Sequence, residues 1–386
     1  MAILGNLIEQ VRGVSYKPED LHNTLDDDSI ILLRANNIKD GLLNFDDVVY
    51  VDKRKMSEKQ LLRAGDILIC ASSGSKDLVG KAAYVTVDLP MTFGAFCKVI
   101  RPKTECPQYI GHFFNSPYYR ERIANSAAGA NINNIRNEHI DVLEIKWLSL
   151  EERYDVVEVL DNVSKLIALR KEQLAKLDQL VKSRFIELFG GADYPKVLFE
   201  NVCVFLRNGA SIKQTKGAGG YPITRIETLS NDVFNIDRLG YADITDLEKY
   251  QSYVLHNGDI LISHINSVAY LGRAVQYRGQ LDTPIIHGMN LLCARIADSY
   301  NPTYIEWFFK TPMAKEYIST ITKKAVNQAS ITTSDLKKMQ VPNPPKNLQD
   351  QFAAFVEQTD KSKLAIQQSL DKLELLKKSL MQEYFG

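Results

Sequence analysis

Polar side chains gather in loops at corresponding places of the two halves of the chain. One cluster follows an apolar run that ends at Cys70, and its counterpart follows a run that ends at Ile262. A further cluster precedes each of two heptad-patterned segments. Amide side chains can bind adenine and guanidinium groups can bind guanine, but the same residue types also cap helices and close turns. The members are Ser72, Ser73, Ser75, Lys76, Asn131, Asn133, Asn134 and Arg136 in the first half, and Ser263, His264, Asn266, Ser267, Asn327, Gln328 and Ser330 in the second.

A third polar cluster lies near the start of each half. We interpret it in the same way, as candidate contacts to base edges with helix capping as the alternative. Its members are Arg34, Asn36, Asn37 and Lys39 in the first half and Thr224 and Arg225 in the second.

Two segments resemble the Asn-Pro-Pro-aromatic motif of adenine amino-methyltransferases, in which the aromatic ring stacks on a flipped base. In Asn343-Pro344-Pro345-Lys346 a lysine takes the aromatic position and cannot stack. Asn115-Ser116-Pro117-Tyr118 corresponds to Lys310-Thr311-Pro312-Met313, so the shared element is predicted to be a helix start with proline near its first position. We expect no methyltransferase centre in this chain.

The sequence predicts no catalytic residue, no metal ligand and no cofactor site. The stretch from Gly74 to Ala82 resembles a phosphate-binding loop, but its spacing is one residue too long and alanine replaces the hydroxyl that would hold magnesium. We predict instead that Gly80-Lys81-Ala82 is a turn entering a strand. The 6 histidines fall at no metal-ligand spacing.

The second half of the chain repeats the first at a period of about 195 residues. Gly65-Asp66-Ile67-Leu68-Ile69 returns as Gly258-Asp259-Ile260-Leu261-Ile262, and Tyr109-Ile110 returns as Tyr304-Ile305. Both copies close on a Phe-Gly pair. Colinear matches at a nearly constant offset indicate an internal duplication.

Each copy ends in a segment whose apolar residues are spaced alternately four and three apart, which is typical of a coiled coil. Arg170 and Arg184 interrupt the first seam, and Thr359, Lys363 and Lys377 interrupt the second. Helices of about 35 residues would be roughly 50 Å long. We expect them to pair antiparallel within the chain; dimerisation with another protein is the alternative. The predicted seam residues are Leu160, Val163, Ile167, Leu174, Leu177, Val181, Val356, Ile366, Leu370, Leu373 and Leu380.

The predicted fold is mixed α/β (α+β), with two similar heads held apart by an antiparallel coiled coil and related by a pseudo-two-fold axis. Short β-rich runs, turn clusters and a few helices make up each head. The predicted boundaries are residues 1–150 for the first head, 151–190 for the first helix, 196–345 for the second head and 346–386 for the second helix.

The composition bounds the class and the compartment. The 386 residues include 47 basic and 47 acidic side chains, and 45% apolar residues are ordinary for a globular protein. We expect neither a membrane span nor a secretion signal, and 5 cysteines without a C-x-x-C pair favour the cytoplasm. Zero net charge predicts weak DNA binding by the chain alone, so we expect a partner protein to supply further contacts to the DNA.

The duplicated order of head and helix, the Gly-Asp-Ile-Leu-Ile strands and the segment Leu33 to Gly41 resemble the specificity subunit of type I restriction-modification systems. The resemblance covers nearly the whole chain. It implies that each head is a target recognition domain and each helix a conserved region. The second copy departs from the Arg-x-x-Asn-Ile-Lys pattern at Thr224-Arg225-Ile226-Glu227, which leaves the role of its third cluster open.

The resemblance implies a non-catalytic subunit with several partners: double-stranded DNA, two modification subunits that methylate adenine, and restriction subunits. S-adenosylmethionine, ATP and magnesium would bind those partner subunits. Each head would recognise one half of a bipartite site in the major groove, with half-site centres about 34–36 Å apart. Because the heads diverge more than the helices, we expect an asymmetric site.

Three alternatives remain at this point. The chain could serve a two-subunit system with a fused methyltransferase-nuclease, act as a coiled-coil scaffold whose heads bind protein, or be a methyltransferase itself.

Overall fold

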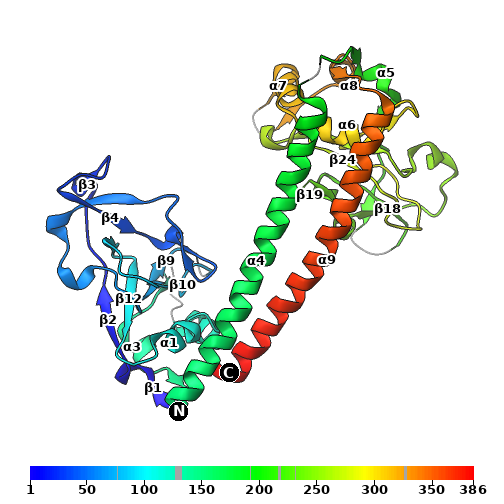
Figure 1. Cartoon of the computed structure of the whole chain (residues 1–386). Helices are drawn as coiled ribbons and strands as arrows, with labels where there is room; N and C mark the ends of the chain where they lie inside the picture. The colour runs from blue at the N-terminus through cyan, green and yellow to red at the C-terminus, as the bar shows by residue number, and fades with distance from the viewer. Residues whose placement is uncertain (76, 127–132, 192, 216–218, 231, 326–327) are drawn as a thin grey trace. The chain divides into compact units, whose positions relative to one another are not determined.

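The computed structural model describes all residues except 76, 127–132, 192, 216–218, 231 and 326–327. The chain divides into two compact units. Unit 1 contains Met1–Gln173 and Ile366–Gly386, and unit 2 contains Leu174–Ala365. Each unit therefore combines one head with one half of each long helix. These helices are α4 (Leu150–Phe189) and α9 (Lys346–Phe385), both of 40 residues (Figure 1).

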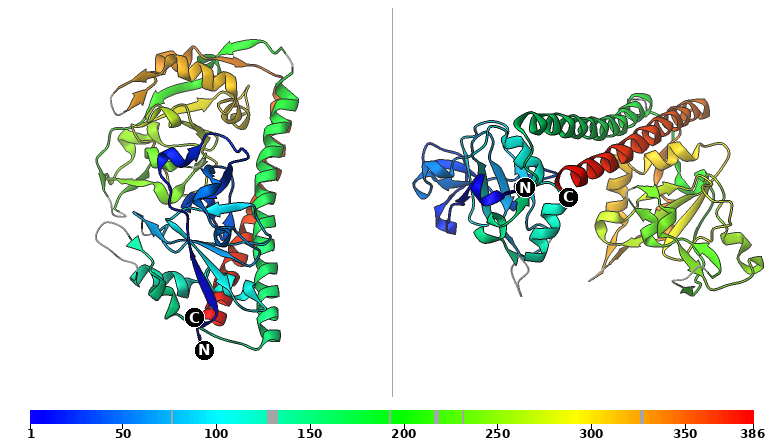
Figure 2. Two further views of the ribbon diagram at one scale, coloured as in Figure 1. Left: turned by 90° about the vertical axis from the view of Figure 1, so that its left-hand side faces the viewer. Right: turned by 90° about the horizontal axis from the view of Figure 1, so that it is seen from below.

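A four-stranded antiparallel sheet of order β10-β8-β12-β2 forms the centre of the first head (Figure 2). All four residues of β8 are buried, because both faces of this strand are covered. Ile67 and Ile69 belong to the core beneath the short helices, and Leu68 and Cys70 belong to a second core on the opposite face. The strands are β2 (Ile8–Arg12), β8 (Ile67–Cys70), β10 (Ala82–Tyr84) and β12 (Cys97–Pro102).

A further four-stranded sheet, of order β11-β4-β7-β3, covers that second core. Its β11 pairs with β4 in parallel, whereas β7 pairs antiparallel with both β4 and β3. Its strands are β3 (Leu21–His22), β4 (Ser29–Leu33), β7 (Val49–Asp52) and β11 (Met91–Phe93). Three two-stranded pairs complete the head: β1 (Ala2–Ile3) and β14 (Glu144–Ile145), β5 (Ile38–Lys39) and β6 (Leu42–Leu43), and β9 (Ser72–Ser73) and β13 (Asn133–Asn134).

The second head has a central sheet of the same design, with the order β16-β25-β22-β24. Its outer part differs, because a three-stranded sheet of order β17-β21-β18 replaces the four-stranded one of the first head. The two heads thus share their central sheet and diverge outside it. The central strands are β16 (Cys203–Asn208), β22 (Ile260–Ser263), β24 (Ala274–Gln276) and β25 (Leu291–Ile296).

The remaining strands of unit 2 are short. Those of the outer part are β17 (Gln214–Thr215), β18 (Tyr221–Ile223), β19 (Leu229–Ser230), β20 (Val233–Phe234) and β21 (Gly240–Ala242). The others are β15 (Lys196–Leu198), β23 (Ile265–Asn266), β26 (Lys323–Lys324), β27 (Ala329–Ser330) and β28 (Gln340–Pro342).

In each unit, short helices pack between the central sheet and the long helices. Pro117 begins α2 (Pro117–Ser126) and Pro312 begins α7 (Pro312–Ile321), as predicted for helix starts with proline near the first position. Tyr109 of α1 donates its hydroxyl to the Lys146 carbonyl at 2.7 Å, and Tyr304 of α6 makes the corresponding bond to Pro342 at 2.8 Å. The helices are α1 (Pro107–Phe113), α2 (Pro117–Ser126) and α3 (Asn137–Asp141) in unit 1, and α5 (Phe199–Val202), α6 (Pro302–Phe308), α7 (Pro312–Ile321) and α8 (Thr333–Lys337) in unit 2.

The two long helices contact each other within each unit, along the predicted seams. In unit 1 the Arg170 guanidinium donates to the Ser369 hydroxyl at 3.2 Å, and in unit 2 Lys363 pairs with Asp178 at 2.5 Å. The first half of α4 meets the second half of α9, and the converse holds in unit 2, so the helices run antiparallel. Of the predicted seam residues, Leu160, Val163, Val181, Val356 and Leu370 are buried, whereas Ile167, Leu174, Leu177, Ile366, Leu373 and Leu380 are half-buried.

The repeated Gly-Asp pair proves to be structural. Gly65 and Gly258 adopt φ values of 90° and 95°, a region that favours glycine. Asp66 is buried and pairs with Arg101 of the neighbouring strand, as Asp259 does with Arg295. The motif therefore fixes the start of the central strand in both heads. Over the described part of the chain, no helix is long and apolar enough to cross a membrane.

Candidate nucleic-acid interface

In the first head, β-pairing joins two of the polar clusters. The strand β9 follows β8 directly and pairs antiparallel with β13, with Ser73 opposite Asn133 and Ser72 opposite Asn134. Clusters about 60 residues apart in sequence are thereby combined into one structure, which we call the first polar ribbon (β9 and β13). Ser72 and Ser73 are half-exposed, while Ser75 and Asn134 are exposed.

The corresponding clusters of the second head are joined in the same way. The strand β23 follows β22 and pairs with β27, with Ile265 opposite Ser330 and Asn266 opposite Ala329. A third strand, β26, extends this second polar ribbon (β23, β27 and β26) and carries the exposed Lys323 and Lys324. The second ribbon is therefore the more basic of the two.

A corresponding backbone hydrogen bond anchors each ribbon. The Ile135 amide donates to the Ala71 carbonyl at 2.7 Å, and the Ile331 amide donates to the His264 carbonyl at 2.9 Å. Ala71 and His264 each connect a central strand to its ribbon, and Ile135 and Ile331 are buried. Each ribbon is thus attached to the end of the most buried strand of its head, which gives its polar side chains a rigid base.

Several members of these clusters support the ribbons from within. Ser263 is buried and its hydroxyl accepts a hydrogen bond from the Asn266 amide at 3.2 Å. His264 is also buried, its Nδ1 has no hydrogen-bond partner among the described residues, and burial lowers the pKa of its imidazole. Ser267 and Gln328 are exposed, and Ser330 is half-exposed. Arg136 is exposed and lies 3.7 Å from Glu138.

Lys98 supports the first ribbon and was not predicted from the sequence. This lysine is only 7% exposed, and its ammonium donates to Gln10 at 2.9 Å, to Asn137 at 2.7 Å and to the Ile135 carbonyl at 3.4 Å. All three acceptors are neutral, and burial lowers the pKa of Lys98 to about 8. The corresponding residue of the second head is the buried Leu292. A single lysine in a strand gave no signal in the sequence.

The third polar cluster has its side chains bonded within each head. Asn37 is buried, its amide donates to the Asn44 and Asp47 carbonyls, and its Oδ1 accepts from the Arg34 backbone. Arg34 and Asn36 both bind the Asp47 carboxylate, while Lys39 is exposed.

The counterpart in the second head is bonded in a similar way. Thr224 is buried and accepts from the Gly288 amide, and Arg225 donates to Gln214. Capping, the alternative that the sequence left open, is what Asn37 does, because its Oδ1 accepts from the Arg34 backbone at the start of a short turn. Thr224 instead accepts a long-range hydrogen bond from Gly288. Asn37 and Thr224 are both buried and bonded within their heads, so neither belongs to the candidate nucleic-acid interface.

Some predicted contacts lie outside the described residues: Lys76, Asn131 and Asn327. Asn133 belongs to β13.

The segments that resembled catalytic motifs are structural in this chain. Gly80 has a φ of 80° and Gly272 a φ of 71°, and each turn leads into a strand, β10 or β24, as predicted. Lys346 begins α9 and pairs with Asp350 at 2.6 Å. Within the described ranges, no group of three or more His, Cys, Asp or Glu side chains could hold a metal ion.

Comparison with known proteins identifies the family. A family model described as the type I restriction modification DNA specificity domain matches residues 196–376. The specificity subunit of the type I restriction enzyme EcoKI from Escherichia coli (strain K12) is 32% identical over 374 residues, which cover 90% of this chain and 79% of the relative. That of the StySPI enzyme from Salmonella potsdam is 28% identical over 407 residues, covering 97% and 86%.

Solved structures share the fold over the whole chain. The S subunit of the type I restriction-modification system from M. genitalium aligns with a TM-score of 0.59 and 13% identity, covering 100% of this chain and 95% of that one. A chain from a structural study of complex assembly and conformational transition in a type I system gives a TM-score of 0.58 and 18% identity, covering 100% and 96%. At such identities these likenesses show the fold alone.

The duplicated heads, each joined to the same pair of antiparallel helices, define a class of DNA-specificity proteins with two recognition domains. The chain belongs to the family of type I restriction enzyme specificity subunits. Its function is that of the DNA-recognition subunit of a type I restriction-modification complex.

Proposed function

We propose that each head recognises one half of an asymmetric, bipartite site in double-stranded DNA, using its polar ribbon. The observation that carries this proposal is the convergence of two polar clusters on one ribbon, at the same end of the central sheet, in both heads. A two-stranded ribbon is narrow enough for the major groove, where each base pair offers a distinct pattern of donors and acceptors. The long helices set the length of the unread spacer.

The two ribbons differ in the contacts that they offer to DNA. Asn134 and Ser75 in the first and Asn266 and Ser330 in the second offer the hydrogen-bonding groups that base edges require. Lys323 and Lys324 add two exposed charges to the second ribbon, suited to phosphate contacts. The second head therefore contributes more of the non-specific affinity, and the first head depends more on its partners.

Catalysis belongs to partner subunits in this proposal. Two modification subunits, carrying S-adenosylmethionine, methylate adenine in each half-site, and restriction subunits cleave unmodified DNA with ATP and magnesium. The outer faces of α4 and α9 carry exposed leucines that suit helical partners, and such association would bury them. They are Leu166, Leu169 and Leu180 on α4, and Leu364, Leu375 and Leu376 on α9. The complex would act in the cytoplasm.

Paired ribbon variants of the full complex test this proposal once the site has been mapped. Asn266→Ala with Ser330→Ala should reduce methylation of the cognate site about tenfold or more, and relax base preference in one half-site only, because about 1–3 kcal/mol of discrimination resides in each good contact. Ser75→Ala with Asn134→Ala should affect the other half-site. If both double variants kept the wild-type preference in both half-sites, the ribbons would not be the reading elements.

The lysines of β26 test the phosphate contacts separately. Lys323→Ala with Lys324→Ala should weaken binding of all sequences alike and reduce the salt slope of the binding constant by about 2. Lys249→Ala removes an exposed lysine of the same head outside the ribbon and is the matched control. An unchanged salt slope would remove β26 from the interface.

A further inference from the structure

The charged residues that interrupt the two helical seams differ in how they are satisfied. Arg170 binds Ser369 and Gln173, Arg184 binds Glu187 at 2.8 Å, and Lys363 binds Asp178. Lys377 forms no hydrogen bond or ion pair with any described residue, although it is half-buried. Burial, together with the nearby Lys171, lowers the pKa of Lys377. One seam cation is thus left without a partner.

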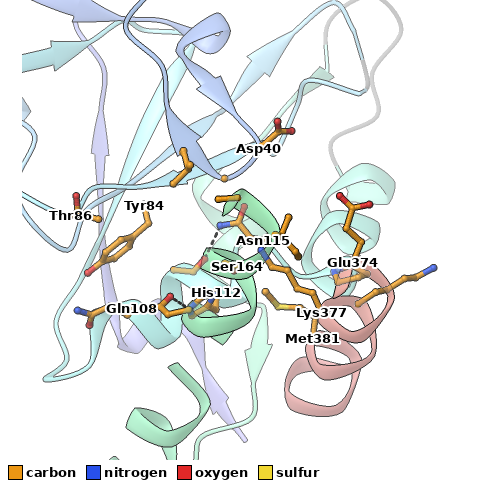
Figure 3. A pocket seen from close by; sticks show the side chains of 18 of the residues that line it. Asp40, Tyr84, Thr86, Gln108, His112, Asn115, Ser164, Glu374, Lys377 and Met381 are labelled. Atoms are coloured by element: carbon orange, nitrogen blue, oxygen red, sulfur yellow. Dashed lines mark hydrogen bonds and ion pairs between the residues drawn. The ribbon is translucent and has the colours of Figure 1, made fainter. Parts of the chain in front are cut away.

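Lys377 faces a hollow of about 830 Å³ within unit 1. The hollow lies between α1, the β5–β6 turn and the two long helices, and Figure 3 shows Lys377 extending from α9 toward Asn115 and Ser164. Four other ionisable side chains on its walls contact each other in pairs: Lys171 lies 3.1 Å from Glu374, and His112 lies 2.9 Å from Asp161.

Unit 2 explains why this space is open. The α4 and α9 helices correspond residue for residue at an offset of 196, so Lys377 corresponds to Val181 and Met381 to Phe185. By the same comparison of α1 with α6, His112 corresponds to Trp307.

In unit 2 these counterparts fill the space with aromatic side chains. Trp307 packs with its ring centroid 6.4 Å from Phe185 and 5.8 Å from Phe352, and Val181 is fully buried. In unit 1 smaller or polar residues leave the space unfilled and introduce a cation.

The walls of the hollow combine apolar surface with charges of both signs, and Asp40 of the β5–β6 turn lies on the wall together with the paired Asp161 and Glu374. Leu42, Tyr84, Ile167 and Met381 supply apolar surface, and Lys378 supplies a second cation without a partner among the described residues. A volume of this size matches those of small-molecule sites, which are mostly apolar with a few placed polar groups.

The nearby Asp161 and Glu374 carboxylates are paired with His112 and Lys171, so the half-buried Lys377 ammonium has no carboxylate in direct contact among the described residues. An anion in contact with this ammonium would offset the cost of its burial.

We propose that this hollow binds a small organic anion, with its phosphate or carboxylate group against the Lys377 ammonium and its apolar body against Tyr84, Ile167 and Met381. Lysine binds such groups as a point charge. The site is independent of the DNA-recognition proposal, because it lies between a head and the helices and uses no ribbon residue. Its occupant would join the first head to the helix pair and stiffen their junction.

The test uses the full-length chain and four defined probes: adenosine monophosphate, phenyl phosphate, benzoate and citrate. Thermal unfolding and calorimetric titration are measured at constant ionic strength, with adenosine and inorganic phosphate as comparisons. We expect at least one organic anion to raise the melting temperature of the wild type. Lys377→Val, which copies Val181 of unit 2, should melt at a higher temperature without ligand and bind that anion at least tenfold more weakly.

Lys363→Met is the matched control, since it removes the paired seam lysine of unit 2, and it should retain the response. Absence of a response to all four probes overturns the proposal, and so does equal binding by Lys377→Val. If inorganic phosphate raised the melting temperature as much as the organic anions do, the hollow would bind the anion alone, and the proposal of an organic ligand would be wrong. If no probe binds but Lys377→Val loses affinity for the modification subunit, the occupant is an acidic side chain of that partner, which also contradicts the proposal.

Discussion

In both units the head packs against the two long helices through corresponding short helices, but the side chains at this junction differ. In unit 2 the junction is an aromatic cluster of Phe185, Phe189, Trp307 and Phe352 around Val181. In unit 1 the corresponding junction contains a hollow and Lys377, which pairs with no residue that the structure describes. A duplicated fold therefore keeps its backbone plan while its copies acquire separate stabilities and separate chemistry.

The largest expected effect comes from copying the charge of unit 1 into unit 2. Val181→Lys would place an ammonium among aromatic rings at a fully buried position, and we expect a loss of about 3–5 kcal/mol in the free energy of unfolding. Leu180→Lys, at the neighbouring 48% exposed position, is the control and should change stability by less than about 0.5 kcal/mol. Urea unfolding followed by circular dichroism measures both. Equal effects would contradict the described seam.

Truncation of the aromatic cluster should have the next largest effect. Trp307→Ala removes the contacts with Phe185 and Phe352 and the stacking of Lys310, 4.5 Å from its ring, so we expect about 3 kcal/mol of destabilisation. His112→Ala, its counterpart in unit 1, removes a hydrogen bond to the exposed Asp161 and should cost less than about 1 kcal/mol. The same unfolding experiment applies, and a larger loss for His112→Ala would reverse the comparison.

A smaller effect on the free energy of unfolding should depend on pH, because the first head has a buried lysine where the second has a leucine. Lys98 has a pKa lowered to about 8, so between this value and the ordinary lysine pKa the unfolded chain binds more protons than the folded one. Stability from this group therefore rises with pH. We expect it to increase by about 2 kcal/mol from about pH 7 to about pH 9.5, and Lys98→Leu, which copies Leu292, should remove that increase. The measurement is the free energy of unfolding of both proteins across this range. A constant difference between them would mean that Lys98 does not titrate there.

Local spacing was sufficient to predict the long helices and the duplication. Heptad spacing depends on residues within one helix, and residues such as Leu160 and Val181 are buried as expected. The degree of burial was less predictable: Leu174 and Leu177 are only half-buried, because the neighbouring side chains of the other helix decide how far the seam closes.

The candidate site was predictable in position but not in assembly. Polar residues such as Ser72 and Asn134 could be found because both copies carry them in corresponding loops. Their pairing into one ribbon depends on long-range β-pairing, for which the sequence holds no local signal. The burial of Asn37 likewise depends on Asp47 and Asn44, which no motif linked to it. Lys98 and the hollow beside Lys377 emerge only from comparison of the packed units.

The most direct test of the account is a map of adenine methylation across the host genome, with and without the gene for this chain. We predict that deletion abolishes methylation of one bipartite, asymmetric adenine motif, and that the two halves of this motif are the targets of the two ribbons. An unchanged methylome in a host whose partner subunits are expressed and active would contradict DNA recognition by this chain.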